Sequence, residues 1–521
     1  MEVFLPIALL ISAFLALLLG YPVAFTLSGV AFVFGLIGFI VGSFDVTYLS
    51  TLPLRFWGLL TNDILVAVPL FVFMGILLER SRVAESLLST MAEAFGSLRG
   101  GLGYSTIMVG VLLAASTGIM GATVVTMGLI SLPAMLKAGY DKPLATGLIC
   151  ASGSLAQIIP PSTILVFLAV ILQSAYSEAQ MSLGNFAPDT LSVGDLFAGA
   201  FLPGLLLALL YTVYVAVVAL LQPDKAPGLL LDEDQKKGFG QRIVVSLLPA
   251  VLLIFAVLGS IIAGVATPTE AASVGGLGAL ILASIRMISD HFAIRFPQAV
   301  VTRLVFNFWI IFGTCLIIAG LTLGAFGILN LSVITLVLTI GIALSFDSSR
   351  KSFLLALKET SKSTLLITSM IFVLFLGASI FSLIFSRLGG EDLVLNFLGA
   401  MPGGLVGATI FVLFVIFILG CFLDPFEIIF IVMPISGAAL LKMGADPVWL
   451  AIMVGIMLQT SYLTPPFGFA LFFLKGVAPA EVSTADIYKG IIPFVAIQLV
   501  VVGIVFFLPE LATWLPDQIY K

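Results

Sequence analysis

The sequence predicts an all-α integral membrane protein with many spans. Hydrophobic residues make up 61% of the 521 positions and charged residues only 9%, whereas about a quarter of the residues in an ordinary soluble domain are charged. The apolar residues form runs such as 243–262, 304–323 and 491–508. Each run is close to the roughly 20 residues that cross a bilayer as a helix. Lipid admits only helices and closed barrels, and barrel strands alternate in polarity, so these continuous runs predict helices.

Three polar connectors orient the predicted spans. The connectors 222–242 and 347–362 are rich in Lys and Arg, whereas 173–195 carries only acidic charges. Cytoplasmic loops hold the excess of Lys and Arg, so the first two are predicted inside and the third outside. Both termini then lie outside, and the apolar segment from Val3 is expected to be a retained helix. The spans expected from these connectors are 196–221, 243–264, 269–286, 304–323, 331–345 and 363–386.

Two apolar stretches predict helical hairpins. The stretches 102–136 and 404–441 are each too short for two full spans of about 20 residues and a turn. They are therefore expected to be re-entrant hairpins that enter the membrane from opposite faces. The amphipathic segments 79–98 and 351–363 predict helices that lie at the membrane interface.

A similar pattern follows each predicted hairpin and indicates an inverted repeat. Asp141 stands 19 residues before the first proline of the pair at 160–161, and Asp446 stands 19 residues before the first proline at 465–466. A cluster of polar side chains precedes each pair. The first unit runs from inside to outside and the second runs from outside to inside, which is the architecture of many secondary transporters.

A proline pair in mid-membrane predicts a broken helix. Proline lacks an N–H and clashes with the carbonyl one turn earlier, so Pro160 and Pro465 are expected to start a second half-helix. The break leaves carbonyl and N–H groups that lipid cannot satisfy. Oxygen ligands without net charge suit a sodium ion, and half-helix N-termini favour an anionic group. The hydroxyls near the breaks are those of Ser152, Ser154, Thr460, Ser461 and Thr464.

A structural proline kink, in which hydroxyls bond the freed carbonyls, is the alternative for a single site of this kind. Two sites at matched spacing and in opposite orientation favour a functional break.

Three places in the sequence, each with an acidic residue, predict helix caps. Asp424 with Glu427, and Thr267 with Glu270, have the spacing of capping boxes, and Asp446 precedes a proline at a helix start. For Asp424, direct contact with an ion or substrate is the alternative, because acids within membrane segments are often functional.

Motifs over most of the chain resemble the large membrane subunit (M) of tripartite ATP-independent periplasmic (TRAP) transporters. They are Pro69–Leu78, Ile159–Ser162, Ser192–Phe197 with Pro203 and Gly204, Gly264–Ala272, and Leu463–Gly468. The resemblance implies an elevator-type, multi-pass transporter of the ion-transporter superfamily in the bacterial inner membrane. It implies sodium-coupled uptake of a small organic anion (a carboxylate), with sodium as coupling ion and no other cofactor. The implied partners are a small four-helix membrane subunit and a periplasmic substrate-binding protein.

In that family the hairpin tips and the broken helices form the sodium sites. Carried onto this sequence, the resemblance implies one site at Ser116, Thr117, Thr123, Ser152, Gly153 and Ser154, and another at Asp424, Thr460, Ser461 and Thr464. We expect Ser154, Ser162 and Thr464 to contact the substrate, and Pro160, Pro161, Pro465 and Pro466 to form the breaks. The first tip departs from the family pattern, because Ile119 and Met120 interrupt its small residues.

The predicted division alternates scaffold and transport segments. It comprises N-terminal scaffold and interfacial helices (1–100), transport repeat 1 (101–172), scaffold helices (173–286), an extra helix pair (287–346), a scaffold arm helix and span (347–403), transport repeat 2 (404–476) and a C-terminal scaffold helix (477–521).

Other functions fit the sequence less well. A net charge of −5 offers no basic face for nucleic acid, and the single His291 cannot support a multi-histidine metal site. The three cysteines are far apart and are expected to be core residues. A proton-pumping redox subunit would need a chain of ionisable residues through the spans, which is absent, and no nucleotide-binding or enzyme motif is found. A standalone sodium/carboxylate symporter, which needs no binding protein, is the alternative.

Overall fold

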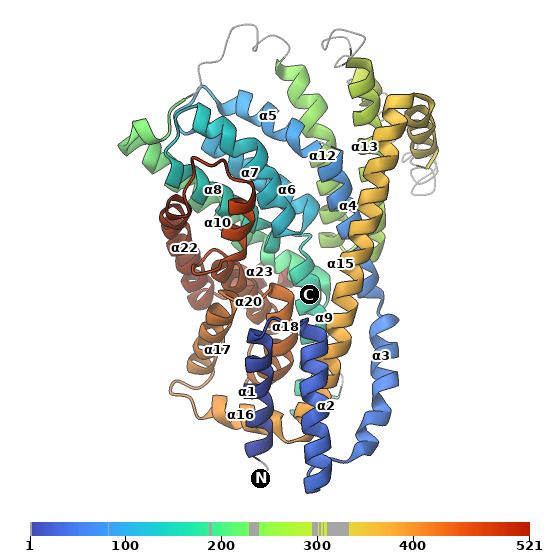
Figure 1. Ribbon diagram of the computed structural model, residues 1–521, viewed down its shortest axis with the longest axis vertical. Coiled ribbons are helices and arrows are strands. Elements are labelled where there is room, and N and C mark those ends of the chain that lie inside the picture. The colour runs from blue at the N-terminus through green and yellow to red at the C-terminus, as the bar shows by residue number, and fades with distance from the viewer. Residues whose placement is uncertain are drawn as a thin grey trace.

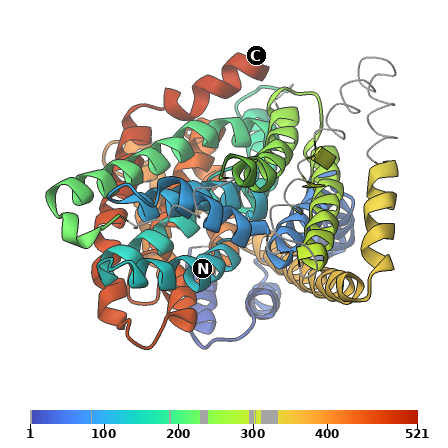
Figure 2. The ribbon, with the colours of Figure 1, turned by 90° about the horizontal axis from the view of Figure 1, so that it is seen from above.

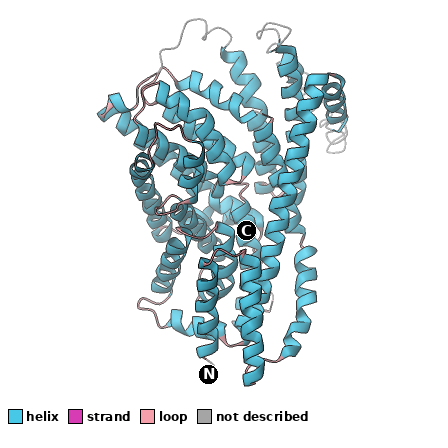
Figure 3. Cartoon of the chain, in the orientation of Figure 1, coloured by secondary structure: helices cyan, strands magenta, loops and turns pink. Residues whose placement is uncertain are grey.

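The protein is an elongated bundle of helices (Figure 1). The structure is a computed structural model, and it describes residues 3–81, 83–186, 190–228, 239–293 and 333–520, with 301, 304–305 and 307–309. Within these ranges every regular element is helical and no strand occurs (Figure 3). The predicted all-α class is therefore confirmed.

The first half contains both long spans and short connecting turns. Its elements are α1 (Phe4–Leu18), α2 (Val23–Val41), the 3-10 turn η1 (Val46–Thr51), α3 (Leu52–Leu60), α4 (Asp63–Arg80), α5 (Val83–Phe95), α6 (Gly101–Thr117), α7 (Met120–Lys137), α8 (Lys142–Ser154), the 3-10 turn η2 (Leu155–Gln157), α9 (Thr163–Ser182) and α10 (Val193–Leu221).

The second half is also built from helices and short turns. Its elements are the 3-10 turn η3 (Pro223–Lys225), α12 (Phe239–Ile262), α13 (Pro268–Ala293), α15 (Asp347–Arg387), α16 (Gly390–Gly399), α17 (Leu405–Gly420), α18 (Pro425–Val432), the π-helical turn η4 (Met433–Gly437), α19 (Ala438–Lys442), α20 (Pro447–Tyr462), α21 (Phe469–Val477), α22 (Thr484–Phe507) and α23 (Glu510–Tyr520).

The multi-span prediction is confirmed by the lengths of these helices. In the described part of the chain, eight helices are long and apolar enough to cross a membrane, and α3 with α4 forms a further pair bent by 50°. The predicted spans 243–264 and 269–286 correspond to α12 and α13. The span expected at 331–345 is a helix from Val333 to Ser345, and the one expected at 304–323 lies almost wholly outside the described residues.

The cap predicted at Asp446 is present, because its carboxylate accepts a hydrogen bond from the Trp449 N–H at 2.8 Å. Asp141, for which no cap was predicted, accepts one from the Leu144 N–H at 3.3 Å. Each carboxylate satisfies an N–H that the first helical turn leaves free, and a proline follows within the first two helical positions. The two broken helices therefore begin alike. The boxes predicted at Thr267 and at Asp424 are also formed.

Both interfacial predictions need correction. The segment 351–363 is not a separate helix, because α15 continues without a break for 41 residues along the long axis of the molecule (Figure 1). No proline or glycine interrupts its amphipathic first part before the apolar part begins, so nothing in the sequence ends the helix there. The segment 79–98 is divided, because Glu79 and Arg80 end α4 and a separate helix, α5, starts at Val83.

Helices from both halves share one core. The largest cluster of buried hydrophobic residues draws on α4, α8, α9, α13, α20 and α22, and a smaller cluster joins α1 and α2 to the end of α15. Seen from above, blue, teal and red segments from early and late in the sequence lie among one another (Figure 2). A close backbone approach joins Gly147 of α8 and Gly490 of α22, where neither position has room for a Cβ atom. Glycine is therefore required on both sides of this contact.

Candidate functional site

The first hairpin, α6 and α7, turns at Gly118. This residue has φ +59°, the left-handed region that glycine occupies without a steric penalty. The tip lies on the first helix break, because the Thr163 hydroxyl donates to the Gly118 carbonyl at 3.0 Å. A Cβ atom at Gly118 would lie 2.7 Å from the carbonyl oxygen of Pro161. Hairpin tip and helix break are therefore in direct backbone contact.

The first break separates α8 from α9. The chain leaves α8 at Ser154, makes one 3-10 turn and resumes as a helix at Thr163, with Ser162 as the extended N-cap. The expectation that Pro160 starts the second half-helix is wrong. A residue that precedes proline is disfavoured in the helical region, and Pro160 precedes Pro161, so the half-helix starts later, at Thr163. The Ser162 hydroxyl donates to the Gln157 carbonyl at 2.6 Å and closes the break.

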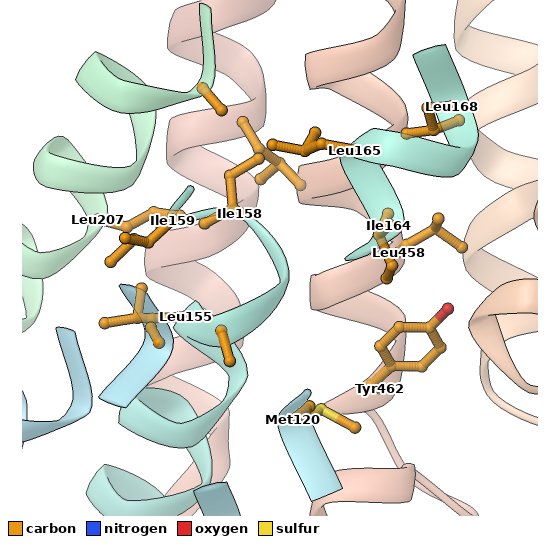
Figure 4. Packing of buried hydrophobic residues seen from close by; sticks show 14 of the residues in the cluster. Met120, Leu155, Ile158, Ile159, Ile164, Leu165, Leu168, Leu207, Leu458 and Tyr462 are labelled. Carbon is orange, nitrogen blue, oxygen red and sulfur yellow. The ribbon is translucent and has the colours of Figure 1, made fainter. Parts of the chain in front are cut away.

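The break is surrounded by apolar side chains. Leu155 and Ile159 lie beside Leu207 of α10, and Ile164 lies beside Leu458 of α20 (Figure 4). All of these residues are buried. Water is therefore largely excluded from the sides of the first break, and its backbone groups must find partners in the protein or in a bound ligand.

The second break separates α20 from α21. Helix α20 ends at Tyr462 and α21 starts at Phe469, so Pro465 does not start the half-helix either, for the same reason as in the first repeat. Both Pro-Pro bonds are cis. The Pro466 carbonyl accepts a hydrogen bond from the Tyr488 hydroxyl of α22 at 2.8 Å. Unlike the first break, the second is open, because Phe467 is 63% exposed.

The second hairpin meets the second break in the same way. Helix α17 ends at Gly420, where a Cβ atom would collide with the Ser461 side chain. The rings of Phe422 and Phe467 are in edge contact, with centroids 5.8 Å apart. Asp424 starts α18, accepting from the Phe426 N–H at 3.0 Å. Each hairpin tip therefore lies against the break of its own repeat.

Several carbonyl oxygens at the breaks have no donor. Among the hydrogen bonds of the described residues, none ends on the carbonyls of Pro160, Pro161, Thr464 or Pro465. Backbone carbonyls that lack partners inside a membrane protein are the ligands from which alkali-cation sites are built. The two breaks thus present the oxygen groups that the sequence predicted, although the half-helices start later than expected.

The predicted ligands of the first repeat differ in their hydrogen bonding. The hydroxyls of Ser116 and Thr123 bond carbonyls of the preceding turn at 3.0 Å. Ser152 is fully buried, and its Oγ has no hydrogen-bond partner among the described residues. Gly153 lies against Val124 of α7 without room for a Cβ atom. The side chain of Thr117 lies outside the described part of the structure.

The hydroxyl groups predicted as ligands in the second repeat hydrogen-bond backbone carbonyls of the preceding turn. The hydroxyls of Thr460, Ser461 and Thr464 donate to carbonyls three or four residues earlier at 2.7–2.9 Å. Their lone pairs remain available as acceptors, which is the arrangement that a cation requires. Thr464 lies at the break itself, whereas Thr460 and Ser461 are fully buried in the last turn of α20.

Buried polar side chains that sequence reasoning did not assign link helices far apart in the chain. Gln459 Nε2 donates to Ser154 Oγ at 3.0 Å and so joins the two repeats, and Gln498 Nε2 of α22 donates to the Tyr211 hydroxyl of α10 at 2.8 Å. The signal in the sequence was a glutamine within a long apolar run, next to other polar residues in the case of Gln459 and alone in the case of Gln498. Thr163 was also missed, although it follows the predicted break directly.

Comparisons with known proteins place this arrangement in a family. The family described as tripartite ATP-independent periplasmic transporter, DctM component, matches residues 10–295 and 291–511. The chain is 26% identical to an ectoine/5-hydroxyectoine TRAP transporter large permease of Ruegeria pomeroyi, over 97% of both chains. It is 25% identical to a C4-dicarboxylate large permease of Vibrio cholerae, over 96% of this chain and 95% of the relative.

Two further similarities agree with that match. A sialic acid large permease of Vibrio cholerae is 23% identical over 96% of this chain and 95% of its own length. The YdaH transporter of Alcanivorax borkumensis shares the fold, with a TM-score of 0.53 and 14% identity over 90% of this chain and 88% of that one. The chain therefore belongs to the DctM-component family of tripartite ATP-independent periplasmic transporters, as a large multi-pass subunit of the inner membrane.

Proposed function

We propose that this protein takes up a small organic anion by sodium-coupled secondary transport. A periplasmic substrate-binding protein would deliver the substrate, and a small four-helix membrane subunit would assemble with this chain. The observation that carries the proposal is the pair of broken helices, each with carbonyl oxygens that lack donors and each covered by its own hairpin tip. Family membership supports secondary transport and the two partners.

The proposed sodium sites lie where tip and break meet. The first would use the open carbonyls around Pro161 with the unpartnered hydroxyl of Ser152. The second would use those around Pro465 with the Thr464 hydroxyl and Asp424. A bound cation would supply the partner that the buried carbonyls of the first break lack, and would bind the partly exposed oxygens of the second, so sodium should order both tips. The substrate would then bind between the tips, near Ser154, Ser162 and Thr464.

The proposed mechanism is an elevator. The transport repeats 101–172 and 404–476 would move as one body against a scaffold that includes 1–100 and the long helix α15. The named relatives transport an ectoine, a C4-dicarboxylate and a sialic acid. These compounds carry a carboxylate group, whereas the isethionate named for a further relative carries a sulfonate. The feature they share is an organic acid group, which supports an organic acid as the substrate of this chain.

Uptake into proteoliposomes tests the proposal. The chain and its small subunit are reconstituted, and a panel of radiolabelled organic acids is offered with and without an inward sodium gradient and the binding protein. Uptake that needs both identifies the substrate and supports the tripartite mechanism. Uptake with sodium but without the binding protein would favour a standalone symporter. Uptake that is indifferent to sodium would contradict the coupling.

A further inference from the structure

A side-chain hydrogen bond joins the two broken helices. Gln459 lies one turn before the second break, and its Nε2 donates to Oγ of Ser154, the last residue of α8 before the first break, at 3.0 Å. The two residues are 305 positions apart in the chain, and neither is exposed to solvent. The ends of both first half-helices are therefore tied together at the point where each backbone opens.

The bond lies among fully buried side chains. A second buried side-chain bond ties α10 to α22, where the Tyr211 hydroxyl accepts from Gln498 Nε2 at 2.8 Å. All four side chains have zero relative exposure. In a low-dielectric interior such bonds are strengthened, and an unmade one is costly. Movement of one half-helix end therefore either moves the other end or breaks a bond that water cannot replace.

We propose that Gln459 is a positioning residue that makes cation binding at the two breaks cooperative. The inference rests on the sodium sites of the proposed function. A cation at one break fixes the end of that half-helix, and the bond between Gln459 and Ser154 then fixes the end of the other. Part of the ordering needed at the second site is complete before its own cation arrives. The second cation accordingly binds more tightly than the first.

Equilibrium binding of radiolabelled sodium to the protein with its small subunit measures this cooperativity, because uptake that needs two ions is sigmoidal even when they bind independently. Wild type should give a sigmoidal binding curve with a Hill coefficient approaching 2, about the number of sites. Gln459→Met, which keeps the side-chain length and removes the donor, should give a Hill coefficient of about 1. Its half-saturating sodium concentration should rise by about 5-fold or more, the lower end of typical coupling between sites. The uptake rate at saturating sodium should be retained, which a merely misfolded protein would not show.

Three further variants make the test specific. Ser154→Ala removes the acceptor and leaves Gln459 in place, so it should lower the Hill coefficient in the same way; only the Hill coefficient is compared for this variant, because Ser154 is itself an expected sodium and substrate contact. The double variant should have the Hill coefficient of Gln459→Met, because both substitutions remove one bond. Ser284→Ala is the matched control, since this buried serine bonds only the Leu280 carbonyl of its own helix, at 2.7 Å. It should keep the wild-type Hill coefficient.

The outcomes separate this inference from the function on which it rests. Wild-type uptake without any sodium dependence would overturn the sodium sites themselves. Sodium-dependent uptake with a binding Hill coefficient of 1 in wild type would leave the transport function standing and overturn the coupling. A sigmoidal binding curve retained in both Gln459→Met and Ser154→Ala would also overturn it. Sodium titrations of thermal stability in detergent, at constant ionic strength, give the same comparison for a variant that binds but does not transport.

Discussion

Substitution of Gly118 by alanine should separate the first hairpin tip from its break. At φ +59° an alanine costs about 1–2 kcal/mol of backbone strain. Its Cβ would also lie 2.7 Å from the Pro161 carbonyl oxygen, which is backbone and cannot turn aside. The tip must then move, and the 3.0 Å bond from Thr163 is lost. That bond contributes about 0.5–1.5 kcal/mol.

A matched control separates the effect of the lost contact between tip and break from the effect of backbone strain. Gly264 has φ +66°, but the nearest atom to its Cβ position is 3.9 Å away. Gly264→Ala therefore carries similar strain without a collision. About 1 kcal/mol of lost contact corresponds to roughly a 5-fold change in affinity. Gly118→Ala should therefore raise the half-saturating sodium concentration in the proteoliposome assay by about 5-fold or more, and Gly264→Ala should leave it unchanged. Equal sodium curves for the two variants would refute a site between tip and break.

Three other substitutions test neighbouring parts of the same structure. Thr163→Val removes the hydroxyl that bonds the first tip and should raise half-saturating sodium about 2–10-fold, from the 0.5–1.5 kcal/mol of one hydrogen bond. Ser152→Ala removes a buried hydroxyl without a partner, so thermal stability without sodium should be unchanged or higher while sodium-dependent uptake falls; lower stability without sodium would contradict the ligand role. Asp446→Ala removes an N-cap and should cost about 1 kcal/mol, seen as a lower melting temperature with the sodium curve retained.

Features governed by local chemistry could be predicted from the sequence. The caps predicted at Thr267, Asp424 and Asp446 need only a side chain and the N–H groups a few residues later, and all three formed. The positions of the two breaks follow from proline alone. The predicted starts of the second half-helices are wrong. Each second proline disfavours a helical conformation at the proline before it, so the half-helix starts later.

Features set by distant partners could not be predicted in the same way. Gln459 stood in a polar cluster next to predicted ligands, but its partner lies in the other repeat. The charges of the segment 351–363 predict a helix at the membrane interface. Its continuity with the span depends on the absence of any helix-ending residue before the apolar part. The charge pattern alone does not show whether the helix ends before the apolar part or continues into it.

Both repeats contain a broken helix, but the first break is buried and the second is partly exposed. This difference should determine how strongly each proposed sodium site responds to substitution. Residues 158–163 are buried throughout, whereas Phe467 at the second break is 63% exposed. An oxygen ligand lost at an open site can be replaced by water at small cost. At the first break residues 158–163 are buried, so a lost ligand leaves a buried charge or carbonyl that water does not readily reach. The sodium site beneath Gly118 should therefore tolerate substitution less well than the site near Phe467, even though the two proline motifs are alike.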